Sequence, residues 1–186
     1  DRIHVIDSEN LSTGIGHLVV EAAVMAGKGM SAADIEKNIL ELRPRVRASF
    51  VVDTLTYLHR GGRCSGLAAM AGGVLKLHPR IEVNNGKMNP GKKYRGRMKN
   101  VVLDYVKDME EDLKKAKKDR VFITHSGCDK EIVDEVKNYL KLTTYFTPHK
   151  IIKRKIIFPN LKCYNKYSLL LMLLWSGNIR SSFYCR

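Results

Sequence analysis

Helix-like and strand-like segments alternate between residues 2 and 141, and this order limits the fold more than any other feature of the sequence. In the helix-like segments apolar residues recur every three or four positions, whereas the strand-like segments are short apolar runs. The order is strand, helices, strand, hairpin, helix, strand and helix. This alternation predicts a mixed α/β chain in which helices pack on a sheet.

Capping residues, turn residues and prolines set the ends of the predicted elements. Ser31 and Asp34 resemble a capping box at the start of the second helix, and Pro44 ends that helix. The sequence Asn84-Asn85-Gly86 between two apolar runs predicts a hairpin. Strands are expected at 2–6, 50–52, 77–83, 87–89 and 121–124, and helices at 14–26, 31–43, 54–60, 66–76, 97–118 and 130–141.

The composition is that of a chain with a buried core, since 44% of its 186 residues are hydrophobic. No apolar run reaches the roughly 18 residues of a membrane span. The four cysteines form no CxxC pair, so no disulfide framework is expected and a cytoplasmic location is predicted. His125 and Cys128 could form half of a metal site, but no second pair of ligands is near them in the sequence. No metal or cofactor is therefore predicted.

The net charge of +14 suggests binding to nucleic acid, but its distribution argues against that function. Residues 150–186 hold eight basic and no acidic residues, which is more than half of the excess. The basic stretches also lack interleaved aromatic residues. A basic nucleic-acid-binding protein, or another interaction protein without a lipid ligand, stays as the alternative function. For residues 150–186 two explanations stay open: a basic surface segment, or an out-of-frame reading of an A/T-rich gene.

The sequence DSENLSTGIG at residues 7–16 joins the first predicted strand to the first predicted helix. One interpretation is a turn in which Ser12 and Thr13 cap the helix. The other is an anion site, because a helix N-terminus offers unpaired N–H groups and a partial positive charge. Gly14 and Gly16 would then let the anion approach the backbone. The residues alone leave both interpretations open.

A basic cluster lies further along the chain and is a second candidate anion site: Lys92, Lys93, Arg95, Arg97 and Lys99. A guanidinium can bind a carboxylate or phosphate in a bidentate way, although a run of charges is also typical of a solvated face. The enzyme motifs GxSxG, GxxxxGK[ST] and HExxH are absent from the sequence. The chain is therefore predicted to bind a ligand rather than to catalyse a reaction by itself.

Five motifs, in a characteristic order, resemble the DegV family of bacterial proteins: VIDSENLSTGIG, FVVDTLTYLHRGGRCSG, GGVLKLHPRIEVNNGKM, KYRGRMK and HSGCD. The resemblance covers residues 3–147, and the GGR stretch is its most specific part. It implies a DegV-like two-domain α/β architecture. Residues 1–47 would be the C-terminal part of the first domain, residues 48–149 the mixed-sheet second domain, and residues 150–186 an atypical basic tail. The chain would then be truncated at its N-terminus and divergent or frameshifted at its C-terminus.

The resemblance also implies a function. Members of the family bind a long-chain fatty acid between their domains, and some are the binding subunit of a bacterial fatty acid kinase. Such a subunit is not itself an enzyme. It presents the carboxylate to a kinase catalytic subunit, which makes an acyl-phosphate for phospholipid metabolism. The expected partners are the fatty acid and this kinase subunit, without nucleic acid or a transmembrane segment and with at most transient contact at a membrane surface.

The resemblance assigns the ligand head to the DSENLSTGIG motif. Ser12 matches the serine that contacts the carboxylate in the family, and Thr13, Gly14 and Gly16 stand beside it. These four residues are the expected head-group site.

Two arginine positions complete the residues implied by the resemblance. Arg95, or else Arg97, matches an arginine near the ligand head and the kinase-facing surface. Arg63 of the GGR stretch is the third candidate, and its alternative role is to bond loop carbonyls. The apolar residues within 67–75 are candidates to line the acyl chain, and their alternative role is that of ordinary core residues.

Overall fold

The structure, a computed structural model, describes residues 3–56, 58, 61–62 and 77–142, together with the backbone of residues 151–155 and 168–175. Its helices are α1 (Ser12–Gly27), α2 (Ala32–Leu42), the 3-10 turn η1 (Arg43–Arg45), α5 (Met98–Asp108), α6 (Glu110–Lys115) and α7 (Lys130–Leu142). Its strands are β1 (Val46–Val52), β2 (Leu77–Asn84), β3 (Lys87–Arg95), β4 (Ala116–Ser126), β5 (Ile151–Lys155) and β6 (Ser168–Trp175). Arg63 and residues 66–76, for which a helix and a ligand-lining role were predicted, lie outside the described residues.

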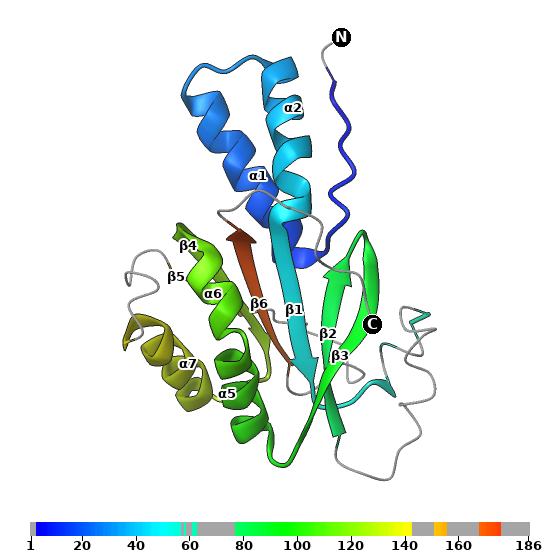
Figure 1. The fold of residues 1–186 in the computed structure, drawn as a ribbon, viewed down its shortest axis with the longest axis vertical. Coiled ribbons are helices and arrows are strands. Elements are labelled where there is room, and N and C mark those ends of the chain that lie inside the picture. Colours follow the sequence, from blue (N-terminus) through cyan, green and yellow to red (C-terminus); the bar gives the residue numbers. More distant parts are fainter. Residues whose placement is uncertain are drawn as a thin grey trace.

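The six strands form one mixed sheet in the order β3-β2-β1-β6-β4-β5 (Figure 1). Strand β1 pairs antiparallel with both β2 and β6. Strand β4 pairs antiparallel with β6 and parallel with β5. The predicted mixed α/β fold is therefore confirmed.

The two faces of the sheet carry different cores, because successive residues of a strand point to opposite sides. Val51 of β1 lies in a core with α5, α6 and α7, which Figure 1 shows gathered on one side of the sheet. Its neighbours Phe50 and Val52 lie in a second core, with Phe122 of β4. A third, smaller core joins α1, α2 and the start of β1.

The local turn and cap signals predict the structure correctly. The Ser31 hydroxyl accepts a hydrogen bond from the Asp34 amide at 3.2 Å and caps α2. The hairpin between β2 and β3 turns at Asn85 and Gly86, with φ angles of 50° and 73°. Positive φ at both turn residues is what a two-residue hairpin of this hand needs, and Asn-Gly adopts it at low cost.

Two predicted elements differ in the structure. Residues 3–6 form neither helix nor strand, so the strand expected at 2–6 is not found over its described part. The helix expected at 97–118 ends at Asp108, restarts as α6 and becomes strand β4 at Ala116. Three acidic residues in the first turn of α6 favour a new helix start there, because they complement the helix dipole.

Strand β1 is longer than predicted. Polar residues interrupt its apolar pattern, and the sequence therefore predicted only its last part. It begins at Val46 rather than at Phe50. Ser49 is buried within it, and its hydroxyl oxygen lies 2.9 Å from the phenolic oxygen of Tyr105 on α5. A helix partner thus satisfies a polar group that the sequence pattern alone would place in solvent.

Residues 168–175, for which no helix or strand was predicted, form β6 in the middle of the sheet, between β1 and β4. The run Ser168–Trp175 reads SLLLMLLW, and a continuous apolar run is typical of a strand inside a sheet. The domain boundaries expected at residues 47 and 149 stay predictions. Among the described residues, no helix is long and apolar enough to cross a membrane.

Candidate functional site

The capping interpretation of the DSENLSTGIG motif is wrong. The residue before α1 is Leu11, which has an extended backbone, and no side chain caps the helix. Ser12 and Thr13 are instead the first two residues of the helix. The hydroxyls of Ser12 and Thr13 therefore do not cap α1.

Ser12 and Thr13 point in different directions. Ser12 is exposed, and its φ of 48° lies in the left-handed region, which is unfavourable for a residue with a side chain. Thr13 is only 4% exposed, and its Oγ1 lies 2.9 Å from Oγ1 of Thr124 on β4. The structure therefore leaves Ser12 at the surface of the helix N-terminus and uses Thr13 to attach this terminus to the sheet.

The two glycines of the motif also differ. A Cβ placed on Gly14 would overlap the side chain of Asn10, so a glycine is needed here for packing within the chain. Among the described residues, a Cβ placed on Gly16 would meet no atom within 4 Å. The space beside Gly16 is thus open in the described structure, whereas the space over Gly14 is taken by Asn10.

Helix α1 packs on β4 through three matched contacts, which we call the α1–β4 seam. Thr13 meets Thr124, His17 meets Phe122, and Glu21 meets Arg120. Four helical residues rise about 6 Å and two strand residues about 6.6 Å, so residues four apart on α1 match residues two apart on β4. The seam brings the DSENLSTGIG motif onto the strand that leads into HSGCD.

The charged end of the seam is a short ion pair. Arg120 Nη1 donates to Glu21 Oε1 at 2.6 Å, and both side chains are less than one-fifth exposed. A paired and partly buried charge of this kind is costly to separate, because removing one partner leaves the other unpaired. The ion pair therefore stabilises the position of α1 along β4.

His17 lies in the middle of the seam and was not predicted as a site residue. It is 1% exposed, and its ring meets that of Phe122 edge-on with centroids 4.9 Å apart. Within the part of the chain that the structure describes, neither ring nitrogen has a hydrogen-bond partner. Burial, and next the charge of Arg120, lowers the pKa of His17 from 6.5 to about 4. Thr13, His17 and Glu21 are four residues apart in the sequence, and this spacing is the pattern that could have indicated a polar face of α1.

The segment before α1 is attached to the hairpin and to η1. The Gly86 amide donates to the Glu9 carbonyl at 3.0 Å. Arg43 forms an ion pair with the Glu9 carboxylate at 3.2 Å and donates to the Asp7 carbonyl at 3.1 Å. These contacts position the start of α1 from the side opposite the seam.

Arg95 is not near the N-terminus of α1. It is exposed at the end of β3, whereas the β2–β3 turn that contacts Glu9 is at the other end of that strand. A strand of nine residues spans about 30 Å. Across the sheet, β3 is also four strands away from β4, which carries Thr124. The described structure thus brings Ser12, Thr13, Gly14 and Gly16 together and leaves Arg95 and Arg97 apart from them.

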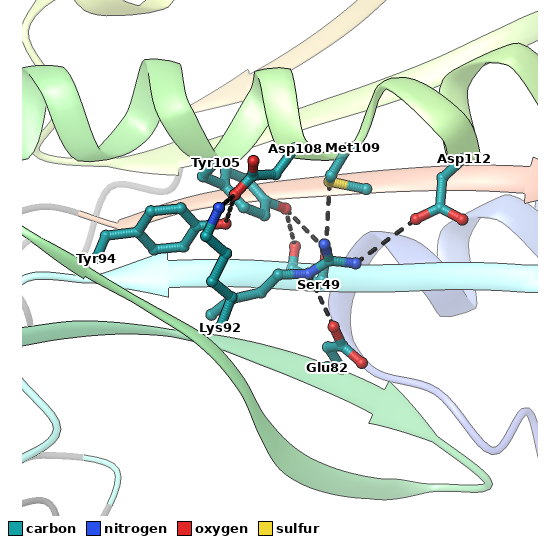
Figure 2. A network of polar contacts seen from close by, with 9 residues as sticks. Ser49, Glu82, Lys92, Tyr94, Tyr105, Asp108, Met109 and Asp112 are labelled. Carbon is teal, nitrogen blue, oxygen red and sulfur yellow. Dashed lines mark hydrogen bonds and ion pairs between the residues drawn. The ribbon is translucent and has the colours of Figure 1, made fainter. Parts of the chain in front are cut away.

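Two lysines of the basic cluster are paired. Lys92 lies 2.5 Å from Asp108, and Lys99 lies 3.3 Å from Glu135. Asp108 also accepts a hydrogen bond from Tyr94 at 2.9 Å (Figure 2). Burial, followed by that hydrogen bond, raises the pKa of Tyr94. These pairings reduce the positive charge that a polyanion could bind at this edge of the sheet.

The same network continues under α5 and α6 (Figure 2). Tyr105, which is fully buried, donates to the Ser49 carbonyl at 2.7 Å. Arg80 lies over the Tyr105 ring, with its Nη2 3.6 Å from Asp112 and its Nε 3.0 Å from Glu82. The Nε contact is an ion pair without hydrogen-bond geometry. Because each charged side chain in it has a partner of opposite charge, we assign this network to the scaffold rather than to a site.

No group of three or more His, Cys, Asp or Glu side chains that could hold a metal ion is found in the described ranges.

A family model described as DegV, an uncharacterised protein family, matches residues 1–156. The chain belongs to the DegV family. It is 39% identical over 110 residues to a DegV domain-containing protein of Caldanaerobacter subterraneus subsp. tengcongensis. It is 33% identical over 138 residues to Protein DegV of Bacillus subtilis. These alignments cover 58% and 72% of this chain, but only 39% and 49% of the relatives.

Solved structures of DegV proteins share the fold. A DegV family protein of Eubacterium eligens loaded with heptadecanoic acid superposes with a TM-score of 0.76 at 17% identity, covering 94% of this chain and 61% of that chain. The Fak B3 protein of the Streptococcus pneumoniae fatty acid kinase, loaded with linoleic acid, gives 0.76 at 18% identity over 94% and 60%. DegV of Bacillus subtilis, a fatty acid binding protein, gives 0.66 at 24% over 92% and 60%. At these identities the likeness establishes the fold.

Proposed function

We propose that this chain binds a long-chain fatty acid and holds its carboxylate at the N-terminus of α1. The observation that carries the proposal is Ser12. It is exposed at a helix N-terminus, has an unfavourable left-handed backbone and does not cap the helix. Strain of this kind in a folded protein is often associated with a functional site. The fatty acids in the structures of DegV relatives support the choice of ligand.

The helix terminus supplies the chemistry that a carboxylate needs. The first N–H groups of a helix have no helical acceptor, and the positive end of the helix dipole attracts an anion. The Ser12 hydroxyl can donate a further hydrogen bond, and the open space beside Gly16 allows the ligand to approach. Arg95 and Arg63 remain proposed ligand contacts, and the geometry around Ser12 does not depend on them.

Tail and head of the ligand would have different energetic roles. Burial of each CH₂ group is worth about 0.8 kcal/mol, so a long acyl chain would gain on the order of 10 kcal/mol before ordering costs. Contacts to the carboxylate would add about 1–3 kcal/mol. The tail would therefore drive binding, and Ser12 would orient the carboxylate.

We further propose that the carboxylate is presented to a separate kinase subunit, which would convert it to an acyl-phosphate. The likeness to the Fak B3 protein supports this assignment. The chain would then be a carrier without catalytic residues of its own, acting in the cytoplasm and in phospholipid metabolism. Its surface would meet the kinase near Ser12.

The first experiment is mass spectrometry of a denaturing organic extract of the purified protein, expressed from its gene with any residues that flank this chain. A stoichiometric fatty acid supports the proposal and gives the preferred chain length. The proposal fails if the protein is empty while a DegV relative, purified in parallel, is loaded.

A pair of serine variants tests the role of Ser12. Ser12→Ala should leave the free energy of unfolding nearly unchanged, weaken fatty acid binding by about tenfold and impair phosphoryl transfer by the kinase. Ser31→Ala is the matched control, because Ser31 caps α2. It should lower stability by about 1 kcal/mol and leave binding unchanged. Equal binding by wild type and Ser12→Ala would contradict the assignment.

A further inference from the structure

His17 is the buried polar group of the described structure that most needs an explanation. It is 1% exposed, and neither ring nitrogen is hydrogen-bonded to any of the residues that the structure describes. A buried donor without a partner is destabilising, because the group gives up its hydrogen bonds to water on folding. Native proteins leave few such groups, and each calls for a specific reason.

Packing alone does not explain a histidine at this position. The contact with Phe122 is edge-on between two rings, and a phenylalanine would keep it without the unpaired nitrogens. His78 provides the comparison within the same chain. It is equally buried, but its ring nitrogens lie 3.2 Å from the carbonyls of Val52 and Gly96.

The position of His17 relates it to the N-terminus of α1. It lies one helical turn after Thr13 on the same face of the helix, and side chains so spaced are about 5–6 Å apart at Cβ. The groups that act on its ring from α1 and β4 are Phe122, Arg120, Glu21 and Lys117. The acidic member, Glu21, is paired with Arg120, so the one carboxylate that acts on the His17 ring already has a cation as its partner.

We propose that His17 is a further ligand-binding residue, whose ring N–H donates a hydrogen bond to an oxygen of the head group held at the N-terminus of α1. The inference rests on the proposed function and adds His17, one helical turn after Thr13, to the head-group site. Binding of a fatty acid would supply the hydrogen-bond partner that the ring lacks. His17 would then select an oxygen-bearing head group over a purely apolar ligand.

The test is the response of the two buried histidines to oleate. Long-range ¹H–¹⁵N spectra of the delipidated protein report the ring nitrogens of His17 and His78 separately. Oleate should shift the His17 resonances and raise the pKa of His17, because a bound carboxylate stabilises the protonated ring. The His78 resonances should stay in place.

Two variants measure the contribution to affinity. His17→Phe should weaken oleate binding tenfold or more, the usual loss for a hydrogen bond to a charged group, without lowering the melting temperature of the ligand-free protein. His78→Phe is the control and should lower that melting temperature while leaving oleate affinity unchanged.

The outcomes separate this inference from the proposed function. If wild type binds oleate but its His17 resonances do not move, or if His17→Phe binds oleate as tightly as wild type, His17 is not a ligand contact and the proposed function stands. If wild type binds no fatty acid at all, both fail. The spectra of wild type decide the question even if His17→Phe does not fold.

Discussion

Acidification should destabilise the ligand-free protein through His17. The pKa of this ring is about 4 in the folded chain, against 6.5 ordinarily, because the ring is buried and Arg120 is near. Between these two values the unfolded chain binds a proton that the folded chain does not. The free energy of unfolding contributed by His17 is therefore fully present above pH 6.5 and is lost as the pH falls towards 4.

The size of the effect follows from the two pKa values. At pH 5 the loss should be about 2 kcal/mol, and below pH 4 it should level off near 3 kcal/mol. For a chain of this length, 2 kcal/mol corresponds to a fall in melting temperature of about 4–8 °C. The whole effect belongs to one side chain, so it should disappear with that side chain.

Urea unfolding of wild type and His17→Phe at pH 7.5, 6 and 5 measures the effect. Other groups also titrate in this range, but they are shared, so the difference between the two proteins isolates His17. We expect His17→Phe to gain about 2 kcal/mol relative to wild type as the pH falls from 7.5 to 5. A difference between the two proteins that does not change with pH would refute the reasoning, since His17 would then titrate alike in both states.

Three further predictions concern the helix terminus and the scaffold. Gly14→Ala should destabilise the protein by about 1–3 kcal/mol, because the methyl group meets Asn10, whereas Gly16→Ala should stabilise it by about 0.5–1 kcal/mol in urea unfolding. Tyr105→Phe should cost about 1–3 kcal/mol by the same assay, as the buried Ser49 carbonyl loses its donor. Tyr94 should ionise above the usual pH of about 10, followed by absorbance at 295 nm, and Asp108→Asn should lower its pKa. An unaltered titration in Asp108→Asn would show that the carboxylate does not act on Tyr94.

Local signals in the sequence were sufficient for the hairpin and for the cap of α2, because each depends on residues close together in the chain. Asn85 and Gly86 adopt the positive φ angles that their types allow, and Ser31 bonds to Asp34 three residues away. The helices predicted at 14–26, 31–43 and 130–141 and the strands predicted at 77–83 and 121–124 also match elements of the structure. These features need no knowledge of the rest of the fold.

Pairings between distant segments could not be predicted in this way. Thr13 was considered as a helix cap, and its hydroxyl in fact meets Thr124, 111 residues away. Ser49 interrupts the apolar pattern of its strand in the sequence, and its hydrogen-bond partner, Tyr105, is 56 residues away. The apolar run Leu169–Trp175 is too short for a membrane span and lies in the segment 150–186, for which no strand was predicted, although its apolarity suits a strand inside a sheet.

The central place of β6 also has a consequence for the order in which the chain is made. Val46 of β1 pairs with Leu174 of β6, so the ribosome adds more than 120 residues before the second partner of β1 exists. Until then β1 and β4 each present an unpaired edge, which is an aggregation risk. Pairings this distant in sequence also slow folding. During synthesis this chain should therefore depend on chaperones until β6 emerges, and nascent chains that stall before residue 168 should be cleared rather than folded.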